Sequence, residues 1–289
     1  MSDQMPLVSI GVPVYNEGKW LRGALDSLLA QEFRDFELII SDNASTDETH
    51  DICMEYVSRD PRVRYYRNEK NLGGARNFNR VFELSQGEYF MVSAADDRRH
   101  PAFLSRCVEV LNRHPSVVLV YSQTVLIDDK GDCHGFMPGS LDTRGYDALS
   151  RYHLVMWGYI YGNHVYGLIR ADALKKTRLF LNTFGNDRVL LLELSLLGEF
   201  AYIPEALFYR NRIRQGNNKY LRDKRWLIGL DPSNQKRISF PGICLFKEYL
   251  KTAVGAPLPA RKRLLLVVSV VTGFLGMFGR GWVRPFFMK

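Results

Sequence analysis

Short apolar runs alternate with helical patterns through the first half of the chain, and this alternation restricts the fold more than any other feature. Leu7–Val14, Phe36–Ser41 and Tyr89–Ser93 are short, mostly apolar runs bounded by polar or turn residues, which is the pattern of buried strands. Strands that alternate with helices over short connections form parallel sheets with helices on both faces. The sequence therefore predicts an α/β fold with a mostly parallel central sheet.

The remaining elements follow from the same patterns. Ser45 and Glu48 have the spacing of a capping box and predict a helix that runs to about Arg59. Asp128–Thr143 is polar and contains glycine, so we expect a loop there. The other expected helices are Trp20–Ala30, Ala75–Ser85, Ala102–Asn112, Ala171–Lys176 and Asp187–Leu197, and the other expected strands are Val63–Arg67, Val117–Tyr121, Tyr166–Ile169, Phe200–Ile203 and Leu207–Tyr209.

Polar clusters follow three of the expected strands, after Pro13, at Asp42 and at Asp96. The carboxyl ends of parallel strands lie at one edge of the sheet, where open α/β folds bind their ligands. Asp96 and Asp97 are adjacent carboxylates, which repel each other unless a cation or water compensates their charge. A divalent cation with a phosphate ligand would supply that compensation. A solvated turn before the next helix is the alternative.

Composition places the chain among ordinary globular proteins. Its 289 residues, 46% hydrophobic and 24% charged, are enough for one sizeable core. Cys53, Cys107, Cys133 and Cys244 form no CxxC pair, which favours a reducing compartment over a disulfide framework or a zinc site. The N-terminus lacks a basic start followed by a long apolar run, so we expect no signal peptide. These features predict a cytoplasmic protein.

The net charge of +8 is carried by the C-terminal part of the chain. From Arg210 onward there are 17 Lys and Arg against three acids, whereas the preceding residues hold 22 bases and 28 acids. Leu264–Phe278 is an uncharged run between basic residues. As a helix it would span roughly 23 Å, short of the roughly 30 Å hydrocarbon core of a bilayer. It could pack on the body, lie at a membrane surface or, least in keeping with its length, span the membrane. The tail shows no nucleic-acid-binding motif, so we expect no nucleic acid partner.

Val8–Asp51 resembles the opening of the family 2 glycosyltransferases, and the resemblance continues to about Arg212. It implies a GT-A fold, which is a Rossmann-like sheet flanked by helices. It also implies a nucleotide-sugar-binding half at residues 1–125 and an acceptor-binding half with the catalytic base at 126–218. The change in composition after the resemblance ends predicts a basic, partly apolar helical extension at 219–289. The matching segments are Pro13-Val14-Tyr15-Asn16-Glu17, Asp42-Asn43-Ala44-Ser45-Thr46-Asp47, Asn71-Leu72-Gly73-Gly74-Ala75-Arg76-Asn77 and Ala94-Ala95-Asp96-Asp97.

The resemblance implies a metal site next to the donor. The second Asp of the family's Asp-x-Asp motif aligns with Asp96 and the first with Ala94. Asp96 is therefore the expected ligand of Mg²⁺ or Mn²⁺ and a contact of the nucleotide, with Asp97 as a helper. The loss of the first Asp puts the donor-ribose contact and a strict metal dependence in question.

The resemblance also implies a nucleotide pocket. Asp42 is expected to accept a hydrogen bond from the ring N–H of the base, with Pro13, Tyr15 and Glu17 lining the same pocket and Arg76 reaching the base or a phosphate. A carboxylate acceptor favours uridine or thymidine over cytidine, which offers no N–H at that ring position. The residues alone leave open that Glu17 only complements a helix dipole and that Arg76 only faces solvent.

On the acceptor side, the resemblance assigns the general base to Asp187, which would take the proton of the acceptor hydroxyl in an inverting transfer. A plain helix N-terminal acid is the alternative. Arg212 stands where the family often has His, and it could offset diphosphate charge. Trp157 and His164 lie in an aromatic stretch where acceptors often stack in this fold, although aromatic residues in such stretches more often belong to the core.

These inferences predict an inverting glycosyltransferase that moves a sugar from a UDP- or TDP-sugar to a hydroxyl of a polysaccharide or lipid-linked glycan. The basic C-terminus would contact the inner face of the membrane peripherally. A nucleotide-sugar-binding pseudoenzyme is the alternative that Ala94 and the missing His suggest. A nucleotidyltransferase fits less well, because such enzymes have a Gly-rich loop with Arg and Lys where this chain has Tyr15-Asn16-Glu17.

Overall fold

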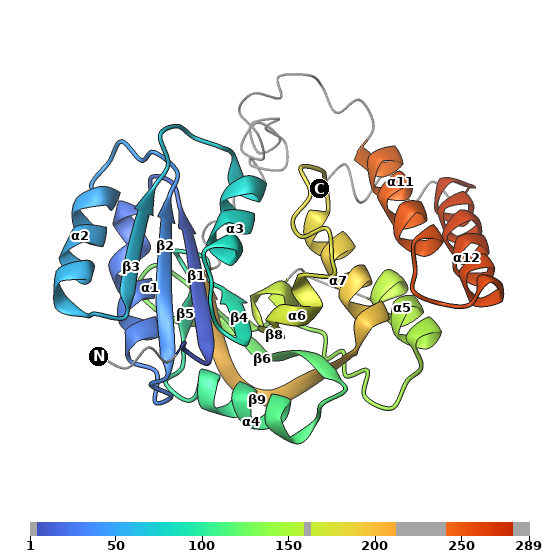
Figure 1. The fold of residues 1–289 in the computed structure, drawn as a ribbon, viewed down its shortest axis with the longest axis horizontal. Coiled ribbons are helices and arrows are strands. Elements are labelled where there is room, and N and C mark those ends of the chain that lie inside the picture. Colours follow the sequence, from blue (N-terminus) through green and yellow to red (C-terminus); the bar gives the residue numbers. More distant parts are fainter. Residues whose placement is uncertain (1–4, 159–162, 212–240, 280–289) are drawn as a thin grey trace.

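The computed structural model describes residues 5–158, 163–211 and 241–279. In these residues nine strands form one sheet in the order β3-β2-β1-β4-β8-β6-β9-β5, with β7 paired to β6. Figure 1 shows α2 near one end of the molecule and α11 and α12 at the other. The expected α/β architecture is confirmed, with a sheet that is parallel through β4 and mixed beyond it.

The N-terminal half holds the parallel strands. β1 (Val8–Val14) lies between β2 (Phe36–Asp42) and β4 (Tyr89–Val92), and β2 continues to β3 (Val63–Arg67). β1 and β2 are buried along their whole length, as expected for strands covered on both faces. Because the four strands run the same way, the polar clusters that follow β1, β2 and β4 lie at one edge of the sheet.

Helices cover both faces of this half. α1, α2 and α4 pack on one face, where the buried Leu21, Leu25 and Leu28 of α1 recur at helical spacing. α3 covers the opposite face through the buried Val81. The four expected helices are therefore present. They are α1 (Gly18–Leu29), α2 (Thr49–Arg59), α3 (Gly74–Glu83) and α4 (Phe103–Arg113).

The capping box expected at Ser45 and Glu48 is wrong. α2 begins at Thr49, and the side chain of Glu48 makes no capping hydrogen bond. Ser45 Oγ instead accepts the backbone N–H of Asn16 from the neighbouring loop at 3.0 Å, so its hydroxyl serves a tertiary contact. Asp47 accepts a backbone N–H at the start of α2 in its place, since Asp47 Oδ1 accepts the Thr49 N–H at 3.1 Å.

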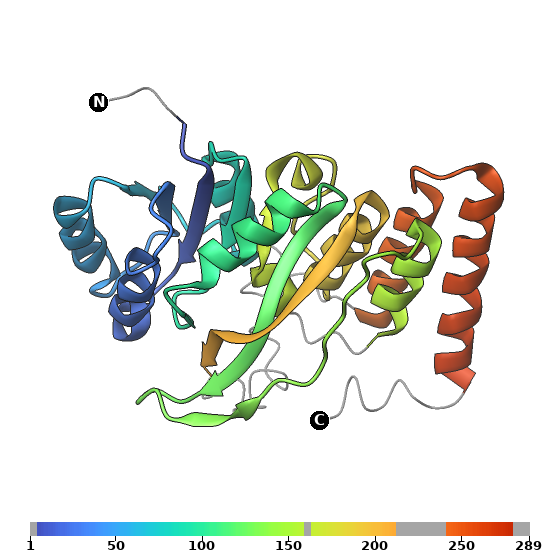
Figure 2. The same cartoon turned by 90° about the horizontal axis from the view of Figure 1, so that it is seen from below.

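The second half departs most from the expected strands. β6 (Val117–Ile127) and β9 (Glu199–Asn211) are long strands that pair in parallel and run side by side in Figure 2. The two short closing strands expected near residues 200–209 are one strand, in which a register shift accommodates Pro204. β8 (Leu168–Arg170) is antiparallel to β4 and β6, and β5 (Arg98–Arg99) is antiparallel to β9. β7 (Cys133–Phe136) lies within the expected loop.

The helices of the second half share one apolar cluster with α3. Arg178 joins two of them, since its guanidinium pairs with Glu193 of α7 at 2.5 Å and with Glu248 of α11 at 2.6 Å. The C-terminal helices are therefore packed onto the body. The elements are α5 (Ala148–Trp157), a 3₁₀ turn (Asn163–Tyr166), α6 (Ala171–Leu174), α7 (Asn186–Leu197), α11 (Pro241–Val254) and α12 (Ala260–Gly279).

α12 confirms that Leu264–Phe278 is helical. Its Leu266, Val270 and Phe274 are buried, and the Phe274 ring lies 5.7 Å from the ring of Tyr249 on α11. One face of this helix therefore packs on the body. Within the described ranges, no helix has both the length and the apolar character needed to cross a membrane.

Candidate functional site

The loops after β1 and β2 are locked together at the carboxyl edge of the sheet. The Asn16 N–H donates to Ser45 Oγ at 3.0 Å, and Asn16 Oδ1 accepts the Thr46 N–H at 2.8 Å. Asn16 has a φ of 55°, a left-handed conformation that Asn tolerates better than most residues. These contacts hold Tyr15 at the surface, 44% exposed, beside the buried Pro13.

Asparagine side chains hold the loop before α3 against the same edge. Asn43 Oδ1 accepts the Leu72 N–H at 2.8 Å and an Asn68 Nδ2 hydrogen at 3.1 Å. Asn77 Oδ1 accepts a second Asn68 Nδ2 contact at 3.1 Å. The family-like segment at residues 71–77 thus adjoins the end of β2, as its expected nucleotide role requires.

Glu17 and Arg76 both lie at helix N-termini on this edge. Glu17 precedes α1 and is partly buried, and its N–H donates to Thr49 Oγ1 at 2.9 Å. Arg76 is exposed and lies in the first turn of α3. Gly73, whose φ is 86°, immediately precedes this helix. A guanidinium at a helix N-terminus adds to the positive end of the helix dipole, so this position suits an anion.

Asp42 is fully buried and its carboxylate is held by neighbouring groups. Oδ1 accepts the Ser45 N–H at 2.8 Å. Oδ2 accepts the Tyr65 hydroxyl at 2.7 Å and Arg67 Nη1 at 2.8 Å. Burial, and next the hydrogen bond to Asp42, raise the pKa of Tyr65, so its hydroxyl stays a donor. The carboxylate expected to meet the base is thus shielded from solvent in this structure.

The adjacent carboxylates after β4 differ in environment. Asp96 is partly exposed, whereas Asp97 is buried at 3% exposure and its Oδ1 accepts the Asn211 N–H at 3.1 Å. Burial raises the pKa of Asp97 above its ordinary value, and the like charge of Asp96 raises it further. The positive charges of Arg210 and Arg99 oppose that rise. A cation beside the pair would relieve the repulsion.

The partly buried Tyr166 connects the two halves of the site. Burial raises the pKa of its hydroxyl to about 12; the charge of Arg210 lowers this pKa, and those of Asp97, Asp96 and Asp187 raise it. Charge effects of this kind are screened beyond roughly 10 Å. The Arg210 guanidinium lies 5.7 Å from the centroid of the Tyr166 ring. The charges of the expected metal acids and of the expected base thus all affect the pKa of one side chain, Tyr166.

Asp187 is positioned by contacts that cross between the halves. It is partly exposed and lies in the first turn of α7. Gly185 immediately precedes this helix, and its φ of 67° allows the chain to turn into it. The preceding segment is clamped to α3: Asn79 Nδ2 donates to the Phe180 carbonyl at 3.0 Å and Asn79 Oδ1 accepts the Phe180 N–H at 2.9 Å. The helix that carries Arg76 therefore also fixes the approach to Asp187.

The two residues expected to stack on the acceptor differ in their burial. His164 is 1% exposed, its ring centroid lies 4.3 Å from that of Tyr121, and burial lowers its pKa to about 4. Trp157 is 45% exposed, but its ring lies so close to Gly273 of α12 that a Cβ there would overlap it. The position of His164 favours the core-packing alternative for that residue, whereas the exposed Trp157 contacts α12 and its acceptor role stays a prediction. Arg212 lies outside the described residues.

A pocket of about 110 Å³ opens beside Asp96. Trp20 of α1, Asp129 after β6 and Asn211 of β9 also line it. Asp129 is held by Trp20 Nε1 at 3.0 Å and by Asn211 Nδ2 at 3.1 Å. The salt bridge of Asp129 to Lys19, at 2.7 Å, and these hydrogen bonds lower its pKa to about 2. The pocket wall is therefore a polar, internally paired surface next to the expected metal ligand.

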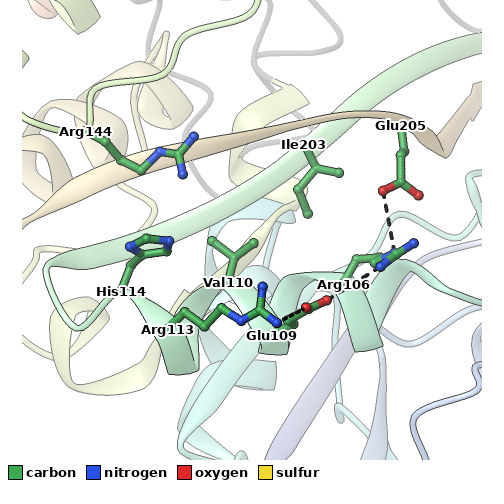
Figure 3. A pocket seen from close by; sticks show the side chains of 8 residues that line it. All are labelled: Arg106, Glu109, Val110, Arg113, His114, Arg144, Ile203 and Glu205. Atoms are coloured by element: carbon green, nitrogen blue, oxygen red, sulfur yellow. Dashed lines mark ion pairs between the residues drawn. The ribbon is translucent and has the colours of Figure 1, made fainter.

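A larger pocket, of about 330 Å³, lies between α4 and β9 (Figure 3). Arg106 within it pairs with Glu205 at 3.5 Å, and Arg113 pairs with Glu109 at 2.7 Å. None of the residues expected at the site lines this pocket. Of the residues expected at the site, Asp96 lines the smaller pocket.

The residues around Asp96 fit a divalent cation bound together with a diphosphate. In the part of the chain that the structure describes, no three His, Cys, Asp or Glu side chains gather closely enough to hold an ion alone. Mg²⁺ in nucleotide sites needs only one or two carboxylates, because phosphate oxygens and water complete its coordination. The repelling pair Asp96 and Asp97 offers that number of oxygen ligands.

Three residues at the site were not singled out from the sequence. Tyr166 was counted only as part of an expected strand, and Arg67 only as a strand end. Arg210 lies in β9, two residues before Arg212, and the sequence predicted no role for it. Its position beside Asp97 depends on the long β9, which the sequence did not indicate.

With this geometry in place, comparison with known proteins identifies the class. The model of the glycosyl transferase family 2 matches residues 9–176, which is more than half of the chain. The chain therefore belongs to glycosyltransferase family 2. The matched region contains β1 to β4, Asp42, Asp96 and Tyr166, and it ends before Asp187.

Among individual proteins, the chain is 30% identical over 219 residues to chondroitin synthase of Escherichia coli, covering 74% of this chain and 30% of that protein. The chain spans less than half the length of the curated relatives it matches. The fold is similar to that of S. aureus TarS 1–349 in complex with UDP-GlcNAc, with a TM-score of 0.67, 18% identity, and coverage of 91% and 71% of the two chains.

A second solved structure shows the same fold. The mannosyltransferase PcManGT from Pyrobaculum calidifontis, in complex with GDP-Man and Mn²⁺, matches with a TM-score of 0.55 and 13% identity over 99% of this chain and 82% of that one. At these identities the likeness shows the GT-A fold of this chain alone.

Proposed function

We propose that this protein is an inverting glycosyltransferase that moves a sugar from a UDP- or TDP-sugar to a hydroxyl of a polysaccharide or lipid-linked glycan. The observation that carries the proposal is that Asp96 and Asp97 follow the parallel strand β4, and that their charges and that of Asp187 all act on the pKa of Tyr166. A transferase needs a place for the diphosphate and a base for the acceptor within one cleft. Family membership and the UDP-GlcNAc complex of the similar TarS structure support the donor class.

On the donor side, Tyr15 and Asp42 receive the nucleotide base, and Arg76 and Arg210 face the diphosphate. Asp96, assisted by Asp97, would hold Mg²⁺ or Mn²⁺, which when bound neutralises the departing diphosphate. The partial positive charge at the α3 N-terminus adds to the same effect.

On the acceptor side, Asp187 takes the proton of the attacking hydroxyl. The bond between that oxygen and the anomeric carbon forms as the bond from the anomeric carbon to the diphosphate oxygen breaks, so the configuration inverts. The nucleoside diphosphate leaves with the electron pair of the broken bond. One oxygen of Asp187, Oδ1, accepts the Arg188 N–H at 2.9 Å, which fixes the carboxylate for this task.

A thermal-shift screen of nucleoside diphosphates and nucleotide sugars, with and without Mn²⁺, tests the donor class. Ligands that bind only the folded state raise the melting temperature, and the gain is about 2.7 kcal/mol at 100 times the dissociation constant. We expect UDP or TDP to give larger shifts than CDP. Equal absence of a shift for every nucleotide would contradict the proposal.

A nucleotide-sugar-binding pseudoenzyme is the second candidate, and Ala94 is the observation that favours it, because the motif there has lost its first acid. It predicts thermal shifts with donor sugars and no release of nucleoside diphosphate. Donor turnover therefore separates the two candidates.

We also propose that the protein contacts the inner, cytoplasmic face of a membrane through α12. Its exposed side chains Leu264, Leu265, Val268 and Leu275 lie on the side opposite the buried Leu266. The helix starts with Arg261-Lys262-Arg263, and the chain after it, residues 280–289, adds basic and aromatic residues. An apolar stripe with basic ends is suited to an anionic bilayer surface.

Vesicle co-sedimentation tests this contact. We expect binding to phosphatidylglycerol vesicles and weak binding to phosphatidylcholine vesicles. Val268→Glu should reduce it, whereas Met54→Glu should not, because Met54 is similarly exposed, at 45%, but lies on α2. Two results would contradict the membrane proposal. One is that Val268→Glu binds vesicles as well as the unchanged protein. The other is that the unchanged protein forms a dimer that Val268→Glu dissociates.

A further inference from the structure

A guanidinium stands between solvent and the carboxylate assigned to the nucleotide base. The Asp42 side chain has no exposed surface, whereas the Arg67 side chain is 40% exposed. Arg67 Nη1 donates to Asp42 Oδ2 at 2.8 Å and Nη2 donates to the Ser45 carbonyl at 2.7 Å. A base that approaches Asp42 from solvent therefore meets Arg67.

The sheet register places Arg67 at the donor edge. Val14 of β1 is paired with Asp42 of β2, and Asp42 is paired with Arg67 of β3. The carboxyl ends of three neighbouring strands thus lie in one row. Tyr15, which follows Val14 and is 44% exposed, stands next to that row. Arg67 belongs to the same edge as the residues expected to bind the nucleotide.

The two side chains offer a complementary pair of hydrogen-bonding groups. A carboxylate has about four acceptor positions, and the contacts with Ser45, Tyr65 and Arg67 use three of those on Asp42. A guanidinium carries five N–H groups. Arg67 bonds Asp42 and the Ser45 carbonyl through its two terminal nitrogens and also contacts the Tyr65 hydroxyl, which together use at most three. One acceptor position on Asp42 is thus left beside further N–H donors of Arg67.

We propose that Arg67 is a specificity-determining residue of the nucleotide site, which donates a hydrogen bond to the exocyclic carbonyl oxygen of a base whose ring N–H is read by Asp42. Uracil and thymine present this pattern, an N–H flanked by carbonyl oxygens. Cytosine keeps the 2-carbonyl but presents a bare ring nitrogen and, in place of the 4-carbonyl, an amino group. With Arg67 at the 4-position, cytosine would set donor against donor at Arg67 and acceptor against acceptor at Asp42. The inference rests on the proposed function, because it deepens the donor class.

The test measures dissociation constants of UDP and CDP, with Mn²⁺, by isothermal titration calorimetry for the full chain and three variants. Arg67→Met removes the donors. Arg67→Lys keeps the positive charge beside Asp42 but loses the planar fork. Arg64→Met is the matched control, because Arg64 of the same strand pairs with the buried Glu37, 7% exposed, away from the donor edge.

We expect the unchanged protein to prefer UDP. Because hydrogen bonds to charged groups are stronger than neutral ones, Arg67→Met should weaken UDP binding about 10-fold or more. CDP binding should stay nearly unchanged. The preference for UDP over CDP should therefore be lost. Arg67→Lys should lose part of the preference and remain folded, which keeps the test decisive if Arg67→Met unfolds. Arg64→Met should lower the melting temperature and keep the preference.

Two results would overturn the inference. One is a folded Arg67→Met or Arg67→Lys variant with the same ratio of UDP to CDP affinity as the unchanged protein. The other is an equal loss of preference in Arg64→Met, which would show a general effect of strand ion pairs. If no nucleotide bound the unchanged protein, the proposed function would fail together with the inference. Binding of UDP that is indifferent to Arg67 would leave the proposed function intact.

Discussion

Burial is the largest cause of the raised pKa of Tyr166, and the charges of Asp96 and Asp187, which come from opposite halves of the chain, both raise it further. Asp96 follows a parallel strand of the N-terminal half, and Asp187 lies in the first turn of a helix in the second half. Two hydrogen bonds between Asn79 of α3 and Phe180 join these halves. The proposed mechanism requires that a donor bound at Asp96 lies within reach of an acceptor that Asp187 deprotonates.

Replacing Asp187 by Asn should separate binding from turnover. The amide keeps the size of the carboxylate but cannot take a proton, and loss of a general base typically costs about 10²–10⁴ in rate. We expect the UDP-induced thermal shift to persist, because Asp187 does not contact the nucleotide. Glu193→Gln, a substitution further along α7, is the control. Unchanged turnover in Asp187→Asn would remove the base from the mechanism.

Replacing Asp96 by Asn should remove the effect of Mn²⁺ on nucleotide binding. One carboxylate fewer leaves the cation with too few protein ligands, and the repulsion that raises the pKa of Asp97 disappears. We expect UDP to give the same small thermal shift with and without Mn²⁺. Asp129→Asn, in the same pocket, should keep the Mn²⁺ effect, because Asp129 is already paired with Lys19. A full Mn²⁺ effect in Asp96→Asn would place the cation elsewhere.

The buried His164 should make the fold sensitive to acid. Its pKa falls from an ordinary 6.5 to about 4 on folding, so the unfolded chain binds a proton that the folded chain refuses. Stability is therefore complete above pH 6.5 and is lost as the pH falls towards 4, by about 3 kcal/mol in total. Urea unfolding at pH 7 and pH 4.5 measures the decrease in the free energy of unfolding between the two pH values. His164→Phe should remove the part of this decrease that His164 causes. His114→Phe, at an exposed site, should keep it; an equal pH dependence in His164→Phe would contradict the assignment.

The contact between Trp157 and Gly273 should make one helix glycine irreplaceable and its neighbour dispensable. A Cβ at Gly273 overlaps the Trp157 ring, whereas one at Gly276 meets nothing within 4 Å. Gly276→Ala should stabilise by up to about 1 kcal/mol through helix propensity. Gly273→Ala should destabilise by about 1–3 kcal/mol. Urea unfolding measures both changes in stability. Adding Trp157→Ala to Gly273→Ala should recover the lost free energy of unfolding, because it removes the ring that the new Cβ overlaps. An increase in stability on Gly273→Ala alone would contradict the packing.

The sequence was informative where a strand is buried and its end is polar. β1, β2 and β4 were recognisable because uninterrupted apolar runs meet turn residues, and the parallel topology followed from short crossovers. It was less informative for β9, because Pro204 resembles a strand break and only the register shift against β6 shows how the strand continues. The capping box predicted at Ser45 was wrong for a similar reason, because the Ser45 hydroxyl accepts a hydrogen bond from Asn16 in another loop.

The same contrast holds for the site. Asp96 and Asp187 were recognisable because motif spacing survives in the sequence, although their roles stay predictions. The shielding of Asp42 by Arg67 was not recognisable, because it depends on which residues of β2 and β3 are paired. His164 was expected near the acceptor from its aromatic neighbours, and only the packing against Tyr121 shows it in the core. Long-range pairing is the information that local patterns lack.

Release of UDP or TDP from a panel of nucleotide sugars, measured with Mn²⁺ and a mixture of glycan acceptors, tests the central claim most directly. We predict release from at least one UDP- or TDP-sugar by the unchanged protein, strong loss in Asp96→Asn and Asp187→Asn, and retained UDP binding in Asp187→Asn. Binding of UDP without release from any sugar, or equal release by Asp187→Asn, would contradict it.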